Sequence, residues 1–180
     1  MILRAALIAC AGLLAGTGTV LAHALPGSAL VLRQNDDVVQ LRVQFPVEEL
    51  IAAAPDLIAL EDVPEGEALP DDLAQALAAY MASHLQIMDG ALAVPLAFEG
   101  ARVQSAFHDH VGQFAMIVTD WTFVSTAFDP ADLVLRYDAI MHEVRNHRAT
   151  VQWATADGAL RRVGAYGYFD AGEGLRLGTP

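Results

Sequence analysis

The sequence predicts a mainly β fold: an antiparallel β-sandwich of about seven or eight strands, with two helices inserted between the early strands. Apolar and polar residues alternate at a period of two in several short segments, most of them after residue 90, and turn-forming residues separate these segments. Two segments between residues 47 and 86 instead repeat apolar residues at helical spacing. The chain has 180 residues and no internal repeat, so one domain is expected after any leader.

The first 22 residues have the composition of a secretory signal peptide. Arg4 is their only charge, an uncharged run extends to Ala22, and small residues stand at the junction. Cleavage is expected before His23 or, at an overlapping site, after Ala24. An uncleaved anchor is the alternative, because the uncharged run approaches the ~18 residues that span a bilayer. Residues 23–180 are therefore expected to form a periplasmic or extracellular domain.

Charge and cysteine content narrow the possible functions of this domain. The chain has 22 acidic and ten basic residues, which gives a formal net charge of −12. Such a surface repels phosphate backbones and anionic headgroups, so nucleic acid and membrane surfaces are not expected partners. The only cysteine, Cys10, lies in the leader, so the mature domain has neither a disulfide nor a thiol nucleophile.

The first elements are expected to be a hairpin and a short helix. Residues 28–34 are an apolar run, residues 35–37 form a turn, and residues 38–45 form a strand. One face of that strand is entirely apolar, with Val39, Leu41, Val43 and Phe45. Pro46 begins a helix over residues 47–54.

An acidic, proline-interrupted connection is expected over residues 55–72, followed by a second helix to about residue 86. Asp71 and Asp72 are expected to cap this helix. Leu73, Leu77, Tyr80, Met81 and Leu85 form its apolar stripe. Asp89-Gly90 turns the chain back into strands.

The remaining chain reads as β structure. Strands are expected over residues 92–98, 113–126, 132–142, 148–155 and 160–169. Pro95 favours an edge position for the first of these. Tyr166 and Phe169 are expected to pack in the core.

No motif indicates an enzyme. His142 and His147 are five residues apart, whereas the zincin helix needs histidines at i and i+4. No G-x-S-x-G elbow occurs either. A non-enzymatic domain is therefore expected.

The histidines suggest a metal site. If residues 143–146 form a hairpin loop, His142 and His147 become opposed neighbours with Cβ atoms ~5 Å apart. His108 and His110 share one face if their segment is extended. Cleavage before His23 would add an α-amine beside an imidazole, a chelate suited to Cu(II) or Ni(II). The alternative for each pair is a solvated turn or a structural hydrogen bond, and His84 is expected on the surface.

Two stretches, AHALPGSALVLR and LRYDAIMHEVRNHRATVQW, together resemble the extracytoplasmic N-terminal domain of HupE/UreJ-type membrane proteins. That resemblance implies an exported β-rich domain and a link to nickel uptake. After the leader, the sequence contains no apolar run long enough to span a membrane, so the resemblance does not imply transport. The AHA junction is also similar to that of small periplasmic copper carriers.

Together these observations predict an exported, non-enzymatic binding domain that binds or delivers nickel or copper beside a membrane transporter. The alternative is a structural or protein-interaction module of the cell envelope without a metal site.

Overall fold

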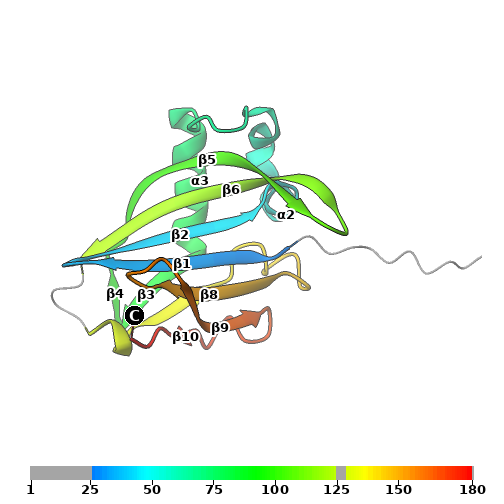
Figure 1. Ribbon diagram of the computed structural model, residues 1–180. Helices are drawn as coiled ribbons and strands as arrows, with labels where there is room; N and C mark the ends of the chain where they lie inside the picture. Colours follow the sequence, from blue (N-terminus) through cyan, green and yellow to red (C-terminus); the bar gives the residue numbers. More distant parts are fainter. Residues whose placement is uncertain (1–25, 125–128, 180) are drawn as a thin grey trace, which may run out of the picture.

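The computed structural model describes residues 26–124 and 129–179 and confirms a mainly β, sandwich-like fold (Figure 1). A six-stranded sheet has the order β5-β6-β2-β1-β8-β9, and a four-stranded sheet has the order β10-β7-β3-β4. The strands are β1 (Ser28–Asn35), β2 (Val38–Pro46), β3 (Leu85–Asp89), β4 (Leu92–Val94), β5 (Ala97–His108), β6 (Gly112–Val124), β7 (Val134–Tyr137), β8 (Arg148–Ala154), β9 (Leu160–Gly167) and β10 (Leu175–Arg176).

The first strand lies in the middle of the six-stranded sheet, between β2 and β8. It pairs antiparallel with β2 and parallel with β8, while the other pairings of this sheet are antiparallel. Gly27 leads into β1 where the backbone of β8 passes very close. A Cβ atom on Gly27 would lie 2.0 Å from the carbonyl oxygen of Arg148, so only glycine fits.

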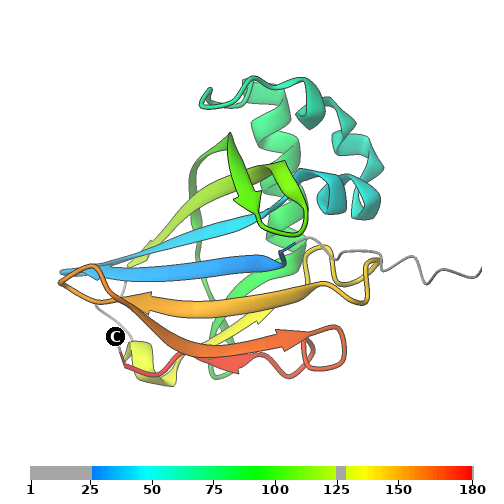
Figure 2. The ribbon, with the colours of Figure 1, turned by 45° about the vertical axis from the view of Figure 1, so that its right-hand side comes forward.

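The helical segments α2 (Val47–Ala53), the 3₁₀ helix η1 (Pro55–Asp62) and α3 (Asp71–His84) lie between β2 and β3. They gather at one side of the sheets, and α3 runs directly into β3 (Figure 2). The N-cap of α3 is Pro70 and no side chain caps it, so the expected capping by Asp71 and Asp72 is wrong. Both aspartates lie in the first turn, where their negative charges interact favourably with the positive end of the helix dipole.

The core lies between the two sheets and extends under α3. The predicted inward face of β2 is confirmed, because all four of its apolar side chains are fully buried. Trp153 is also fully buried and donates its indole N–H to the carbonyl oxygen of Leu177 at 3.0 Å. The apolar side chains that alternate along the strands thus point into the space between the two sheets.

Several predicted boundaries are wrong. The chain leaves the helix at His84, so Leu85 belongs to β3, and Pro95 separates β4 from β5, which lie in different sheets. Residues 97–108 form a twelve-residue strand, of which only residues 97 and 98 lie in a predicted strand. Phe169 is 86% exposed in a turn after β9 instead of packing in the core.

The most consequential difference is in residues 132–142, where the strand ends at Tyr137. Ile140 has a φ of +69°, a left-handed conformation that a β-branched residue rarely adopts. The His142 N–H then donates to the carbonyl oxygen of Asp138 at 3.2 Å, which closes a turn. Ala139, Ile140 and Met141 are all fully buried, so burial here does not follow the alternation of a strand.

Within the described ranges, no helix is both long and apolar enough to cross a membrane.

Candidate functional site

A chain of buried polar side chains joins the start of β1 to α2, β7 and the start of β8. His147 Nδ1 lies 2.5 Å from Glu49 Oε2, and its Nε2 lies 2.7 Å from Ser28 Oγ. The Tyr137 hydroxyl lies 2.6 Å from the same Ser28 oxygen. We call these four residues the Ser28 clamp.

The hydrogen bond from the Ser28 backbone N–H determines which nitrogen of His147 carries the ring proton. The backbone N–H of Ser28 donates to His147 Nε2 at 3.1 Å, so this nitrogen accepts. The ring proton is then on Nδ1 and is donated to the Glu49 carboxylate. A serine, a histidine and a carboxylate in this order are the arrangement of a nucleophilic triad.

The Ser28 clamp is nevertheless closed to a substrate. The residues Ser28, His147 and Tyr137 are only 3%, 2% and 1% exposed, and β1 is a central strand. Burial raises the pKa of Tyr137 well above its usual value, despite its hydrogen bond with Ser28. The clamp therefore fastens four elements together and does not present a nucleophile.

A second group of polar side chains lies beside the clamp, where α3 meets the turn after β7. His84 Nδ1 lies 2.8 Å from Asp138 Oδ1, and the ring centres of His84 and His142 are 4.3 Å apart. The Tyr80 hydroxyl accepts the Ile140 N–H at 2.9 Å, and its ring centre lies 4.7 Å from that of His84. We call Tyr80, His84, Asp138 and His142 the histidine cluster.

Burial perturbs the groups around the histidine cluster. It raises the pKa of Tyr80 to about 12, with the Ile140 N–H acting in the opposite direction. Burial also raises the pKa of Tyr166, and Asp138 adds to this shift. His142 Nδ1 and the Tyr166 hydroxyl are buried and have no hydrogen-bond partner among residues 26–124 and 129–179. A small cavity of about 160 Å³ adjoins the cluster and is lined in part by His84 and Asp138.

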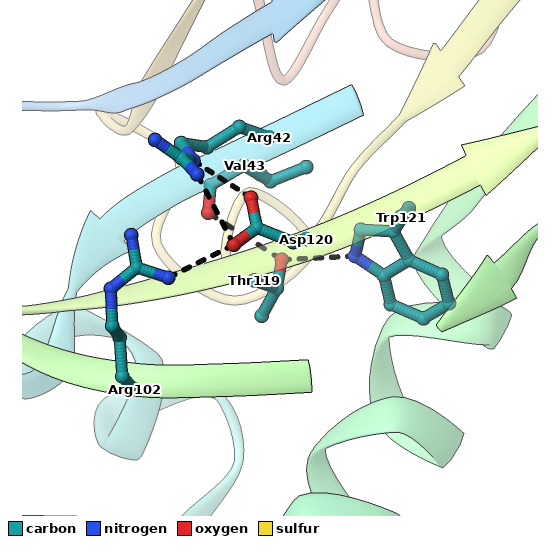
Figure 3. A network of polar contacts seen from close by, with 6 residues as sticks. All are labelled: Arg42, Val43, Arg102, Thr119, Asp120 and Trp121. Carbon is teal, nitrogen blue, oxygen red and sulfur yellow. Dashed lines mark hydrogen bonds and ion pairs between the residues drawn. The ribbon is translucent and has the colours of Figure 1, made fainter. Parts of the chain in front are cut away.

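The third polar feature lies on the outer face of the six-stranded sheet, opposite the face that carries the buried side chains of β2 and β6, and Figure 3 shows it from close by. Asp120 on β6 accepts from Arg42 on β2 at 2.7 and 3.3 Å and from Arg102 on β5 at 2.9 Å. Burial alone would raise the pKa of Asp120, but the two guanidinium groups lower it below its usual value. The carboxylate thus holds two arginines in fixed positions.

Strand register places four arginines on this outer face. Arg42 pairs with Val31, Val31 with Gln152, and Gln152 with Arg162, so one row crosses four strands. Arg33 and Arg102 lie in the neighbouring rows, opposite Gln40 and Val118. A groove of about 770 Å³ runs over this surface, lined by Val31, Arg33, Asn35, Gln40, Arg42, Glu99, Asp120, Trp121 and Thr122.

The predicted histidine pair His142 and His147 does not form. The hairpin that would oppose them is absent, because β7 and β8 lie in different sheets. His147 belongs to the Ser28 clamp, and His142 lies against His84 instead. His84, expected on the surface, has a side chain only 18% exposed.

The other predicted histidines lie elsewhere. His108 ends β5, and His110 is in the hairpin turn, so the segment is not extended through both. Their ring centres are 5.6 Å apart, and the His110 N–H donates to His108 Nδ1 at 3.4 Å. His23 lies outside the described residues. Over residues 26–124 and 129–179, no group of three or more His, Cys, Asp or Glu side chains is placed to hold a metal ion.

Several of these polar residues had no signal in the sequence. Glu49 and Ser28 lie 98 and 119 residues from His147, so no local spacing links them. The arginines of the outer face were detectable in part, because Arg42 stands on the polar side of the most regular strand. The other arginines of the outer face come together only through pairing between strands that are distant in the sequence.

No protein-family model matches the chain, and no curated protein matches it significantly.

Proposed function

We propose that the protein is an exported, non-catalytic binding domain that docks an acidic segment of another envelope protein, such as a membrane transporter, on its outer face. The observation that carries this proposal is the set of four arginines that strand register gathers there. Asp120 and Glu99 are the carboxylates that line the groove on this face. These named groups carry four positive and two negative charges, a local excess of positive charge that favours anions in a chain with a net charge of −12.

The spacing of the charges favours a polypeptide over a small carboxylate. Arg42 and Arg162 are separated by three strand spacings, as are Arg33 and Arg102. At ~4.8 Å per spacing, each pair spans about 14 Å perpendicular to the strands, and Arg33 and Arg102 are also offset by four residues along them. An extended segment advances ~3.3 Å per residue, so about five residues are needed to reach from Arg42 to Arg162, and more to reach from Arg33 to Arg102. A small dicarboxylate is too short to do so.

Fixed side chains add to this argument. Arg42 bonds Asp120 with two nitrogens, and Arg102 adds a third bond. Each guanidinium retains further N–H donors, because the group has five of them. Arginines held in this way lose less conformational entropy when a carboxylate binds. The closed Ser28 clamp, in turn, supports the expectation of a domain without catalytic activity.

Binding of a fluorescently labelled hexaglutamate peptide to the mature protein tests the proposal. Fluorescence anisotropy at ~20 mM salt should give a Kd below about 1 mM, and binding should weaken steeply at ~300 mM salt because exposed charges are screened. Replacing Arg33 and Arg42 together by glutamine should weaken binding by at least fivefold.

The matched control is Arg176→Gln, because Arg176 lies on β10 of the other sheet and pairs with Asp132. It should leave the affinity unchanged. Equal losses in the control and in the double variant would indicate nonspecific charge attraction and would contradict the proposal. The absence of peptide binding at low salt would also contradict it.

A further inference from the structure

The histidine cluster contains an imidazole nitrogen that the fold leaves without a partner. His142 Nδ1 is buried, and no residue in the described part of the chain makes a hydrogen bond with it. Buried polar atoms in native proteins are nearly always paired, and an exception calls for a bound water or ion. The rest of the cluster supplies the surroundings that such an ion needs.

The neighbouring imidazole is arranged as a metal ligand with a carboxylate behind it. An ionised carboxylate has no proton to give, so His84 Nδ1 donates to Asp138 Oδ1 across 2.8 Å. His84 Nε2 then carries the lone pair. Histidines that bind metals almost always donate their other ring N–H to a carboxylate or carbonyl, which fixes the tautomer and the ring orientation.

The distance between the two rings suits one shared ion. Metal–nitrogen bonds of ~2.0–2.1 Å place each imidazole ring centre about 3.2 Å from the ion, so two imidazoles bound at about 90° to each other have ring centres roughly 4.5 Å apart. The ring centres of His84 and His142 are 4.3 Å apart, with planes tilted by 31°. The adjoining cavity is lined by His84 and Asp138 but not by His142, so it offers room for water on the His84 side of the ion.

The backbone that presents His142 is strained. Ile140, two residues earlier, holds its φ of +69° through an N–H bond to the Tyr80 hydroxyl and through two bonds to its own carbonyl oxygen. Residues held in such conformations cluster at functional sites, where the surrounding structure enforces them. Here the strained turn brings His142 against a helix that the chain left more than 50 residues earlier.

We propose that His84 and His142 form a transition-metal site, with Asp138 as the positioning residue and Cu(II) as the preferred ion. Imidazole is a ligand for copper, nickel and zinc, and copper(II) binds a given nitrogen site most strongly among the divalent first-row ions. This site is separate from the outer face, so it can be tested independently of peptide docking.

Titration of the mature, folded protein carrying His23→Ala with copper(II) chloride tests the proposal, because an N-terminal His23 would itself chelate copper. One saturable site should appear, with nitrogen hyperfine couplings from two imidazoles in the paramagnetic resonance spectrum. His84→Ala and His142→Ala should each weaken binding at least tenfold and reduce the couplings to one imidazole. Asp138→Asn should weaken binding while both couplings remain, because it leaves the ligands and alters only their orientation.

The control is the double variant His108→Ala/His110→Ala, which removes the other close histidine pair. It should bind copper as the parent does, and urea unfolding should show that every variant tested is folded. If His84→Ala is not folded, His84→Gln takes its place in the titration. Absence of a saturable site overturns the proposal. So does parental affinity in both the His84 and His142 variants, or loss of binding in the control.

Discussion

Replacing His147 by alanine should destabilise the fold more than the same replacement of an exposed histidine. The imidazole makes three hydrogen bonds: Nδ1 donates to Glu49 Oε2, and Nε2 accepts from Ser28 Oγ and from the Ser28 N–H. Its side chain is fully buried, and that of Glu49 is only 13% exposed. Alanine removes all three bonds and leaves Glu49 and the Ser28 backbone without this partner.

The size of the loss follows from these contacts. A hydrogen bond to a charged group contributes ~1.5–3 kcal/mol, and a buried donor left unsatisfied costs ~1–3 kcal/mol. Ser28 Oγ retains Tyr137 as a partner, so it adds little. We therefore expect a loss of ~3–5 kcal/mol, as when one partner of a buried pair is removed. This is a large fraction of the ~5–15 kcal/mol that stabilises a typical domain.

Urea unfolding followed by tryptophan fluorescence measures this loss, because Trp121 and Trp153 are both buried. With a slope of ~2 kcal/mol/M, the midpoint should fall by about 1.5–2.5 M. His108→Ala, at the end of the β5–β6 hairpin strand, is the control and should stay within about 0.5 kcal/mol of the parent.

A double-mutant cycle identifies the interaction responsible. Glu49→Gln and His147→Ala should show a coupling energy above about 1 kcal/mol, because they contact each other directly. A loss below about 1 kcal/mol for His147→Ala, or additive effects in the cycle, would refute the clamp as described.

Three further predictions concern the close backbone approach at Gly27, the ion pairs of Asp120 and the export of the protein. Gly27→Ala should cost more than about 2 kcal/mol, since its Cβ would overlap a backbone oxygen of β8, whereas Gly172→Ala meets no atom within 4 Å and should be neutral. Equal effects would contradict the close approach. Asp120→Asn should cost less than about 1 kcal/mol at pH 7, because the pair is partly exposed. As the folded pKa is lowered, this cost should vanish as the pH falls below ~3.9, and a cost that persists at pH 2 would count against the ion pairs. Intact-mass analysis of periplasmic protein should find a chain that begins at His23, and full-length protein in the membrane would contradict export.

Much of the β structure could be predicted because it depends on local alternation. The fully buried positions of β2 alternate along the chain, so the inward face of that strand was readable without its partners. The end of the β7 strand was not readable, because it depends on a left-handed Ile140 that the Tyr80 hydroxyl stabilises from a distant helix. Tertiary contacts there override a continuous alternating pattern.

The histidine predictions failed in part for the same reason. The expected pairing of His142 with His147 assumed a hairpin, and the spacing of the two residues permitted one. The structure instead sends β7 and β8 into different sheets, so the intervening segment forms turns and the two rings take different partners. His84 was assigned to the surface from its helix alone, but the turn after β7 packs over it. Long-range topology, which a single sequence does not reveal, decided both outcomes.

The clamp and the histidine cluster are connected through one loop. Ser28 bonds Tyr137 at the start of this loop and His147 at its end, so a single side chain ties both ends together. A strained residue between the ends persists only when its surroundings enforce it, and Ile140 lies in this position. His147→Ala should therefore release the loop, let His142 move away from His84, and weaken copper binding at least tenfold in protein that is still folded. Peptide binding on the outer face should stay unchanged, because none of its arginines contacts the clamp. If the His147 variant loses stability as expected but binds copper as the parent does, the clamp does not hold the histidine pair in place, and α3 alone must position it.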